Sequence, residues 1–333
     1  MIRAAQGKKT YAYDQLKLDK KTVLVIDEAT MVGTRDMHKL LAHAYEKKAK
    51  VVLTGDKRQL PSIAAGTPFN AMLEEHDGFT LDENVRQKVA WLRDAADLYA
   101  DGHHQESLTR FGDQKRLRFS QTREEAIEGL LHDWKNYRPK DIRDSICLAN
   151  TNQEVKEINT RIQDERRLAG ELGKACIAWN GYRFREGDRI VFRENDRKQK
   201  LWNGNIGTIK KLDAKTNRLI VDLDVGSTVD LKLEDYGKQG KVELGYAVTV
   251  HRAQGMSVDV SFVLLGDNAL TSAESSYVAL SRARYDTFIN ADGRSAEYED
   301  VVVYTEAIEQ TAKRLQMSAQ KKLAHQMQQA MST

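Results

Sequence analysis

The stretch TVLVIDEATMVGTRDMHKLLAHAYEKKAKVVLTGDKRQLP, residues 22–61, decides the fold class of this chain. Short β-branched apolar runs at 22–26 and 50–54 flank an amphipathic stretch, TRDMHKLLAHAYEKK, whose apolar residues recur at helical spacing. Strand, helix and strand in this order are typical of a parallel, doubly wound α/β sheet. Thr34 and Asp36 stand where the N-cap of the intervening helix is expected.

Beyond this unit the α/β pattern continues, but a segment with the sequence pattern of short antiparallel strands interrupts it. Between about 174 and 240, short alternating runs are separated by Asn-Gly, Gly and Asp, which is typical of a small antiparallel barrel or meander. The α/β pattern returns at 245–250. The other elements expected are helices at 67–77, 88–137 with breaks near Gly102 and Gly112, 152–172, 277–284 and from about 305, and strands at 116–120, 145–150 and 260–265.

Composition sets limits on the class of protein. A chain of 333 residues is too long for one ordinary core, so we expect two or three domains. No apolar run approaches the roughly 20 residues that span a bilayer. Cys147 and Cys176 lack metal-ligand spacing, so we expect two buried or idle thiols in a reducing cytoplasm. Net charge is +3, and the basic runs at 183–200 and 313–322 are nucleic-acid candidates only if another feature demands such a ligand.

Carboxylates follow both strands of the 22–61 unit, at the sheet edge where α/β proteins bind ligands. Asp27 suits a Mg²⁺ ion held through water, and Glu28 suits the orientation and deprotonation of an attacking water. After the second strand comes Asp56, and the amide of Gln59 can sense a γ-phosphate. The alternative is structural, because Asp27-Glu28 can start a helix and Gly55-Asp56 can build a turn.

Two arginines and a later loop extend this pattern. Arg86 in ENVRQ and Arg282 in VALSRAR can neutralise the charge that builds on a γ-phosphate during phosphoryl transfer. We expect Arg282 to lie on the 277–284 helix and to point out of its packed surface, and the alternative is a surface ion pair. The hydroxyl, imidazole and amide groups of TVHRAQG, residues 249–255, suit contact with sugar and phosphate.

Taken in order, these segments closely resemble the motifs of superfamily 1 DNA helicases of the RecD-like branch, and within it the helicase region of conjugative relaxases of the TraA/MobA type. VLVIDEATMVG resembles motif II, VVLTGDKRQLPSI motif III, ENVRQ motif IV, TVHRAQGMS motif V and YVALSRAR motif VI. The resemblance covers nearly the whole chain. It implies an α/β fold of two RecA-like P-loop NTPase lobes, the first truncated at its N-terminus, with an inserted small SH3-like β-barrel.

The resemblance also implies ATP and Mg²⁺ as cofactors and single-stranded DNA as the partner. Trp202 and Phe192 of the insert can stack on bases or fill its core, and we favour the core. Under this resemblance the catalytic residues are Glu28, Gln59, Arg86 and Arg282, the nucleotide and Mg²⁺ residues are Asp27, Asp56 and Gly255, and the DNA contacts are Thr249, His251 and Arg252.

Four parts of the chain follow from the motif positions. We expect a truncated first lobe at 1–88 and a helical segment with the start of the second lobe at 89–173. The inserted barrel covers 174–240, and the remainder of the second lobe with a C-terminal helix covers 241–333.

The departure from the family pattern is the absence of a G-x-x-x-x-G-K-[ST] loop, whose N–H groups and Lys hold phosphates. Gly7-Lys8-Lys9-Thr10 lacks the upstream Gly and a preceding strand, so we reject it as that loop. One hypothesis is a fragment of an ATP-dependent translocase of conjugative transfer or mobile-element processing, completed by a missing N-terminal segment and inactive alone. The alternative is a DNA-binding or interaction module without ATPase activity.

Overall fold

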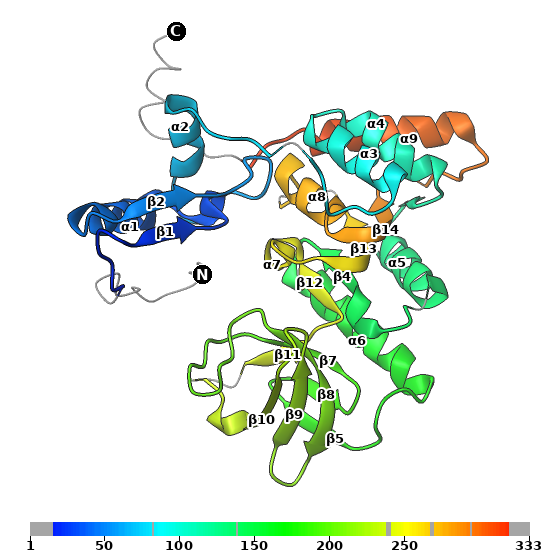
Figure 1. Ribbon diagram of the computed structural model, residues 1–333. Helices are drawn as coiled ribbons and strands as arrows, with labels where there is room; N and C mark the ends of the chain where they lie inside the picture. The colour runs from blue at the N-terminus through cyan, green and yellow to red at the C-terminus, as the bar shows by residue number, and fades with distance from the viewer. Residues whose placement is uncertain are drawn as a thin grey trace.

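The computed structural model describes residues 16–81, 83–137, 139–237, 241–266, 270–293 and 295–319. Gly7 to Thr10, the segment rejected as a phosphate loop, lies outside these residues. Figure 1 shows an N-terminal unit, a larger lobe and an all-β insert on one side of that lobe. No helix in the described ranges is long and apolar enough to cross a bilayer.

The N-terminal unit is a two-stranded parallel sheet, as the strand–helix–strand pattern predicts. Val23 of β1 pairs with Lys50 of β2, and α1 buries Met37, Leu40 and Ala44 against Leu24 and Ile26 on one face of the sheet. The elements are β1 (Val23–Ile26), η2 (Ala29–Met31), α1 (Thr34–Glu46), β2 (Lys50–Leu53) and α2 (Pro68–Glu75).

The second lobe is a five-stranded, wholly parallel sheet in the order β12-β4-β13-β14-β3. Helices α3, α4, α8 and α9 cover one face and α5 and α6 the other, because alternate strand residues enter two separate cores. The strands are β3 (Leu117–Ser120), β4 (Ser145–Ala149), β12 (Ala247–Thr249), β13 (Val258–Leu265) and β14 (Ala283–Asp292). The helices are α3 (Ala90–Ala100), α4 (His104–Asp113), α5 (Arg123–Tyr137), η3 (Ile142–Asp144), α6 (Asn152–Leu168), α7 (Val250–Ala253), α8 (Ala273–Leu280) and α9 (Val301–Leu315).

The insert between α6 and β12 is antiparallel. A hairpin, β5–β6, precedes a five-stranded sheet in the order β10-β9-β8-β7-β11. Phe192 is fully buried, as expected, whereas Trp202 is 49% exposed, so the expectation that both fill the core is wrong for Trp202. The SH3-like class of the insert and the four domain boundaries stay predictions. Its elements are β5 (Cys176–Trp179), β6 (Tyr182–Arg185), β7 (Arg189–Phe192), β8 (Ile206–Asp213), β9 (Arg218–Leu223), β10 (Thr228–Lys232), η4 (Leu233–Asp235) and β11 (Val242–Leu244).

The structure corrects several local expectations. The N-cap of α1 is Gly33, and Thr34 and Asp36 lie within the first turn. The helix break expected near Gly112 is confirmed, because α4 ends at Asp113, and a Cβ at Gly112 would come within 2.9 Å of the Tyr304 ring. The helix expected at 277–284 ends at Leu280, because the chain then enters β14, which pairs with β13. The sequence pattern did not predict β14.

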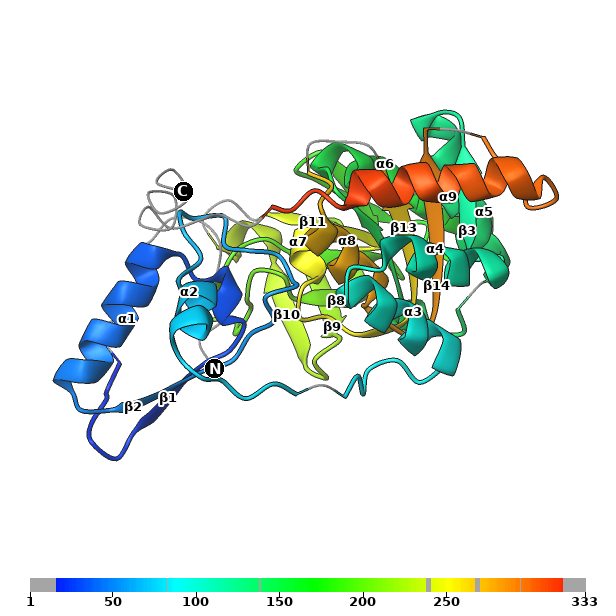
Figure 2. The same cartoon turned by 90° about the horizontal axis from the view of Figure 1, so that it is seen from above.

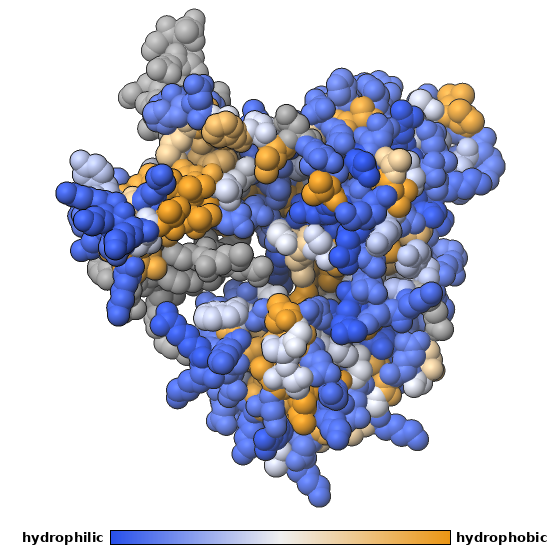
Figure 3. Space-filling view, in the orientation of Figure 1, coloured by the Kyte–Doolittle hydropathy of each residue, from blue (hydrophilic) through white to orange (hydrophobic). Residues whose placement is uncertain are grey.

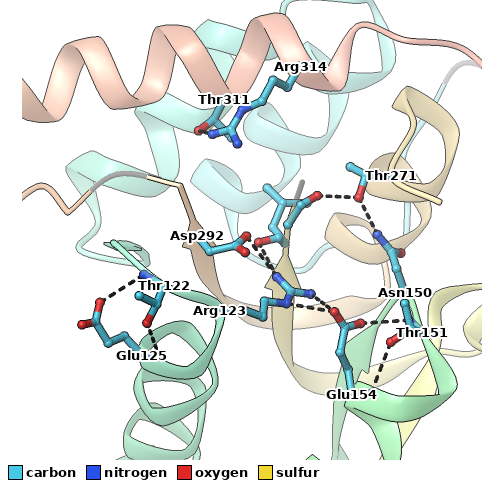
Figure 4. A network of polar contacts seen from close by, with 12 residues as sticks. Thr122, Arg123, Glu125, Asn150, Thr151, Glu154, Thr271, Asp292, Thr311 and Arg314 are labelled. Atoms are coloured by element: carbon cyan, nitrogen blue, oxygen red, sulfur yellow. Dashed lines mark hydrogen bonds and ion pairs between the residues drawn. The ribbon is translucent and has the colours of Figure 1, made fainter. Parts of the chain in front are cut away.

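A single guanidinium joins the carboxyl ends of three strands of the second lobe (Figure 4). Arg123, at the start of α5, lies 2.6 Å from Glu154 of α6 and 3.2 Å from Asp292 at the end of β14. Its Nη1 also donates to the carbonyl of Leu265 at the end of β13. These internal ion pairs fix this edge of the sheet, so we assign Arg123 a structural role.

The insert is fixed to the second lobe by a buried polar network. The hydroxyl of Tyr246 donates to Asp188 at 2.6 Å, and Gln163 of α6 donates to the other carboxylate oxygen at 2.6 Å. Arg166 Nη1 donates to the Tyr246 hydroxyl at 3.0 Å. Burial raises the pKa of Asp188, and these hydrogen bonds oppose that shift. The insert therefore enters the second lobe through a satisfied hydrogen-bond network.

Replacing Tyr246 by Phe is expected to lower the free energy of unfolding by about 1–3 kcal/mol, because buried Asp188 loses a donor and Arg166 an acceptor. Urea unfolding measures the change. Tyr285→Phe is the matched control, since Tyr285 is 48% exposed. Equal losses in the two variants would contradict the role of the network.

Candidate active site

The carboxyl ends of β1 and β2 are tied together by hydrogen bonds. Asp27 Oδ1 accepts from the Thr54 hydroxyl at 2.8 Å and from the backbone N–H of Glu28 at 3.0 Å. The N–H of Ala29 donates to the carbonyl of Thr54 at 2.8 Å. Glu28 has φ 53°, a left-handed conformation that is uncommon and strained for a residue other than glycine. The chain therefore holds Glu28 in a fixed and unusual orientation directly after the strand.

The turn after β2 points toward the second lobe. The carboxylate of Asp56 accepts from the N–H and the Nε of Arg58 at 3.0 and 2.9 Å, and from Gln59 Nε2 at 3.5 Å. The guanidinium of Arg58 lies 5.6 Å from the centre of the Tyr277 ring of α8. Leu60, only 2% exposed, packs in a core of the second lobe. The turn that carries Asp56 and Gln59 is therefore part of the contact between the lobes.

Arg282 is buried, with 1% of its surface exposed. Its Nε donates to the carbonyl of Val278 at 2.8 Å and its Nη2 to the Ser281 hydroxyl at 2.9 Å, but its Nη1 is buried without a hydrogen-bond partner. The expectation that Arg282 lies on a helix and points out of its packed surface is therefore wrong. Arg282 follows the end of α8 at Leu280, directly precedes β14 and is buried. Arg86 comes from the N-terminal side and donates to the Ser257 hydroxyl at 3.1 Å and the Ser281 carbonyl at 3.0 Å.

The two arginines are close enough to affect each other. Burial lowers the pKa of Arg282 to about 10, and the positive charge of Arg86 acts in the same direction. The negative charges of Glu28 and Asp56 oppose this shift. The guanidinium is still protonated at neutral pH. A buried cation with a free N–H beside a second cation favours an anionic ligand between the lobes.

Gln254 and Gly255, which follow α7 in the second lobe, complete this group. Gln254 Nε2 donates to Glu28 Oε2 at 3.1 Å. Gly255 has φ 78°, and a Cβ at this position would lie 3.8 Å from Glu28 Oε1. Glu28 thus faces the loop of the second lobe that the sequence predicted to contact a ligand.

Comparisons with known proteins show the family of this chain. A family model described as an AAA domain matches residues 2–122. The conjugal transfer protein TraA of Rhizobium radiobacter is 31% identical over 287 residues, which are 84% of this chain and 25% of that protein. The ATP-dependent RecD2 DNA helicase of Deinococcus radiodurans is 28% identical over 294 residues, 87% of this chain and 39% of that protein. The chain belongs to the RecD-like branch of the superfamily 1 helicases.

Solved structures support the fold of this RecD-like helicase region. A crystal structure of Bacteroides Pif1 bound to single-stranded DNA aligns with a TM-score of 0.53 at 17% identity, covering 92% of this chain and 80% of that one. The Pif1 helicase of Candida albicans aligns with a TM-score of 0.53 at 18% identity. The expectation of an α/β fold with RecA-like lobes is therefore confirmed. The chain spans about a quarter of the length of its TraA relative.

In this RecD-like helicase region, the residues expected to contact DNA lie near the insert. Thr249 ends β12 and is 8% exposed, and His251 lies in α7. The guanidinium of Arg252 lies 3.5 Å from Glu243 of β11 and 3.3 Å from Asn152 Oδ1 at the start of α6. Burial lowers the pKa of Arg252 to about 10, with a further contribution from Arg193. Arg252 therefore faces the junction of lobe and insert.

The helicase region brings most of the expected nucleotide residues into one group. Glu28, Asp56, Arg86, Arg282 and Gly255 approach one another although more than 200 residues separate the first from the last. Sequence reasoning missed Gln254 as an individual residue, although it belongs to the quoted TVHRAQG run. It also missed Ser281, whose carbonyl accepts from both Arg86 and Gln87. No local signal marks such pairings, because each depends on how the two lobes meet.

Proposed function

We propose that this region binds ATP with Mg²⁺ between the two lobes and hydrolyses it to move along single-stranded DNA, in conjugative transfer or mobile-element processing. The observation that carries the proposal is buried Arg282, whose Nη1 has no hydrogen-bond partner and which contacts Ser281 together with Arg86. A triphosphate supplies the negative charge that would pair with the guanidinium of Arg282. The names of the TraA and RecD2 relatives support the substrate and the process.

Each residue of the site has a role in this reaction. Glu28 takes a proton from the attacking water as the water oxygen bonds to the γ-phosphorus, and the bond to the β–γ bridging oxygen breaks to give ADP and phosphate. Arg86 and Arg282 neutralise the charge on the γ-phosphate, and Gln59 senses that phosphate. Asp27, an exposed carboxylate, would hold Mg²⁺ through water, and this ion screens the phosphate charge when bound.

Single-stranded DNA is the proposed polymer partner. A related fold, that of Bacteroides Pif1, has been solved bound to single-stranded DNA. Thr249, His251 and Arg252 are the proposed backbone contacts in the second lobe. Trp202, half-exposed at a loop of the insert that also carries Lys198 and Lys200, is suited to stack on a base.

The exposed outer face of the β1–β2 sheet indicates a second binding partner, a polypeptide segment. Val23 is 53%, Val25 49% and Val52 40% exposed, although parallel sheets are normally covered on both faces. Figure 3 shows apolar residues gathered over this unit, and Figure 2 shows it extending away from the second lobe. We propose that this face packs against a polypeptide segment that carries the phosphate-binding loop absent from the sequence. Such a loop would add backbone N–H donors and a Lys to the phosphate contacts that the chain itself provides. If the chain binds no nucleotide, the second candidate function is DNA binding without ATPase activity.

Binding of a fluorescent, non-hydrolysable ATP analogue to the purified chain tests the nucleotide proposal, with and without single-stranded DNA and with Mg²⁺ or EDTA. We expect Mg²⁺-dependent binding that Arg282→Met abolishes. Salt-sensitive DNA binding without any nucleotide binding would instead support the second candidate.

A further inference from the structure

Gln254 makes a contact that the roles assigned above do not explain. It follows α7 of the second lobe, yet its side chain reaches the N-terminal unit, where Nε2 donates to Glu28 Oε2 at 3.1 Å. The two residues are 226 positions apart in the chain. The contact therefore exists only because the two lobes meet. Its acceptor is the carboxylate of Glu28, which in the proposed function takes the proton of the attacking water.

The other end of the same amide is unused. Gln254 Oε1 is buried and has no hydrogen-bond partner. A buried acceptor without a donor is costly, so such atoms are rare and usually mark a position that a ligand or water completes. Because an amide is planar, Oε1 is fixed beside Nε2 and therefore close to the Glu28 carboxylate. The atom is an acceptor, so its missing partner must donate a hydrogen.

The loop after α7 approaches the Glu28 carboxylate closely at Gly255. Glu28 and Gly255 both have positive φ, 53° and 78°, which turns the two loops toward each other. A Cβ at Gly255 would lie 3.8 Å from Glu28 Oε1, so the glycine borders the carboxylate oxygen that does not contact Gln254 Nε2. The hydrogen bond between the two side chains uses Gln254 Nε2 and Glu28 Oε2 and leaves Gln254 Oε1 without a partner.

We propose that Gln254 is a positioning residue for ATP hydrolysis: its Nε2 orients Glu28, and its Oε1 holds the attacking water together with Glu28. This inference rests on the proposed function. A water that donates one hydrogen to each oxygen directs a lone pair away from both, toward the γ-phosphorus. Glu28 accepts the proton as the new P–O bond forms, whereas the amide of Gln254 keeps its own protons throughout and fixes the direction of attack.

The same residue connects hydrolysis to the DNA side of the second lobe. α7 covers only Val250–Ala253, so Gln254 stands directly after the helix that begins at the proposed DNA contact Thr249. We expect a shift of α7 on DNA binding to move Gln254 as well, because Gln254 is the residue that directly follows this short helix. Stimulation of hydrolysis by single-stranded DNA is therefore expected to depend on Gln254.

The test compares Gln254→Leu and Gln254→Glu with wild type in steady-state ATP hydrolysis, with and without single-stranded DNA. Gln254→Leu is expected to lower kcat by about 10²-fold, the cost of a misplaced reactant, while KM for ATP and DNA affinity stay unchanged. Gln105→Leu, at an exposed position of α4, is the matched control. A loss of less than about threefold, or a change in KM alone, would overturn the proposal.

The pH profile of kcat in Gln254→Glu distinguishes a positioning role from a purely structural role, because loss of a structural contact would leave this profile unchanged. A second carboxylate beside Glu28 disfavours loss of the last proton from the pair, so the acid limb of the pH profile of kcat moves to higher pH. Asp27 lies on the same loop as Glu28, and Arg282 is a charged group whose charge interacts with that of Glu28. An acid limb identical to that of wild type and Gln105→Glu would overturn the proposal.

A double-mutant cycle separates this inference from the proposed function. If the wild-type chain hydrolyses no ATP, the proposed function fails, and thermal unfolding of Gln254→Ala, Glu28→Ala and the double variant then decides the role of Gln254. Non-additive shifts of Tm support orientation of Glu28 by Gln254. Additive shifts overturn it.

Discussion

Replacing Arg282 by Met is expected to lower the rate of ATP hydrolysis by about 10³-fold or more, because the γ-phosphate loses a fixed guanidinium. The same change is expected to leave the free energy of unfolding unchanged or to raise it by about 1–2 kcal/mol, since an incompletely paired buried cation is replaced by an apolar side chain of similar length. The measurements are steady-state hydrolysis with single-stranded DNA and urea unfolding on the same preparation.

Arg284→Met is the matched control for Arg282. Arg284 stands in the same Ser-Arg-Ala-Arg run, but it is partly exposed and pairs with Asp259 at 2.7 Å. We expect this control to retain activity and to lose at most about 1 kcal/mol of stability, as is usual for an exposed ion pair. A strong loss of stability in Arg282→Met would mean that the guanidinium is structural. Such a result would contradict the anion-binding role on which the proposed function rests.

Replacing Glu28 by Gln is expected to lower kcat by about 10²–10⁴-fold, because an amide does not accept the proton of the attacking water. Nucleotide binding is expected to persist, since the change removes a negative charge next to a triphosphate and leaves Arg86 and Arg282 in place. Single-turnover hydrolysis measures the chemical step, and the fluorescent ATP analogue measures binding.

Glu46→Gln, at the exposed end of α1, controls for the loss of one carboxylate. Its activity is expected to equal that of wild type. Hydrolysis by Glu28→Gln within threefold of wild type would show that another group takes the proton. Loss of analogue binding in Glu28→Gln would instead indicate that Glu28 holds the nucleotide rather than the water.

Local sequence patterns predicted the regular elements well where one physical signal dominated. The β-branched runs before Asp27 and Gly55 form β1 and β2, and Thr67-Pro68 opens α2, because strand preference, helical periodicity and the fixed φ of Pro act over a few residues. The strand that follows Arg282 was missed for the opposite reason. The local pattern predicted a helix as far as Arg284 and no strand after it, and pairing with β13 on one side and β3 on the other decides its state.

The sequence by itself determined the fold class, the antiparallel insert, the family and the residue types expected at a nucleotide site. These properties follow from periodicity and from short motifs, whose residues are neighbours along the chain. The tertiary structure alone decided that Arg282 is buried with one N–H free, that Trp202 is half-exposed and that Gln254 bonds to Glu28. Burial and contacts across 226 residues depend on how two separately folded lobes meet, and no local preference encodes that meeting.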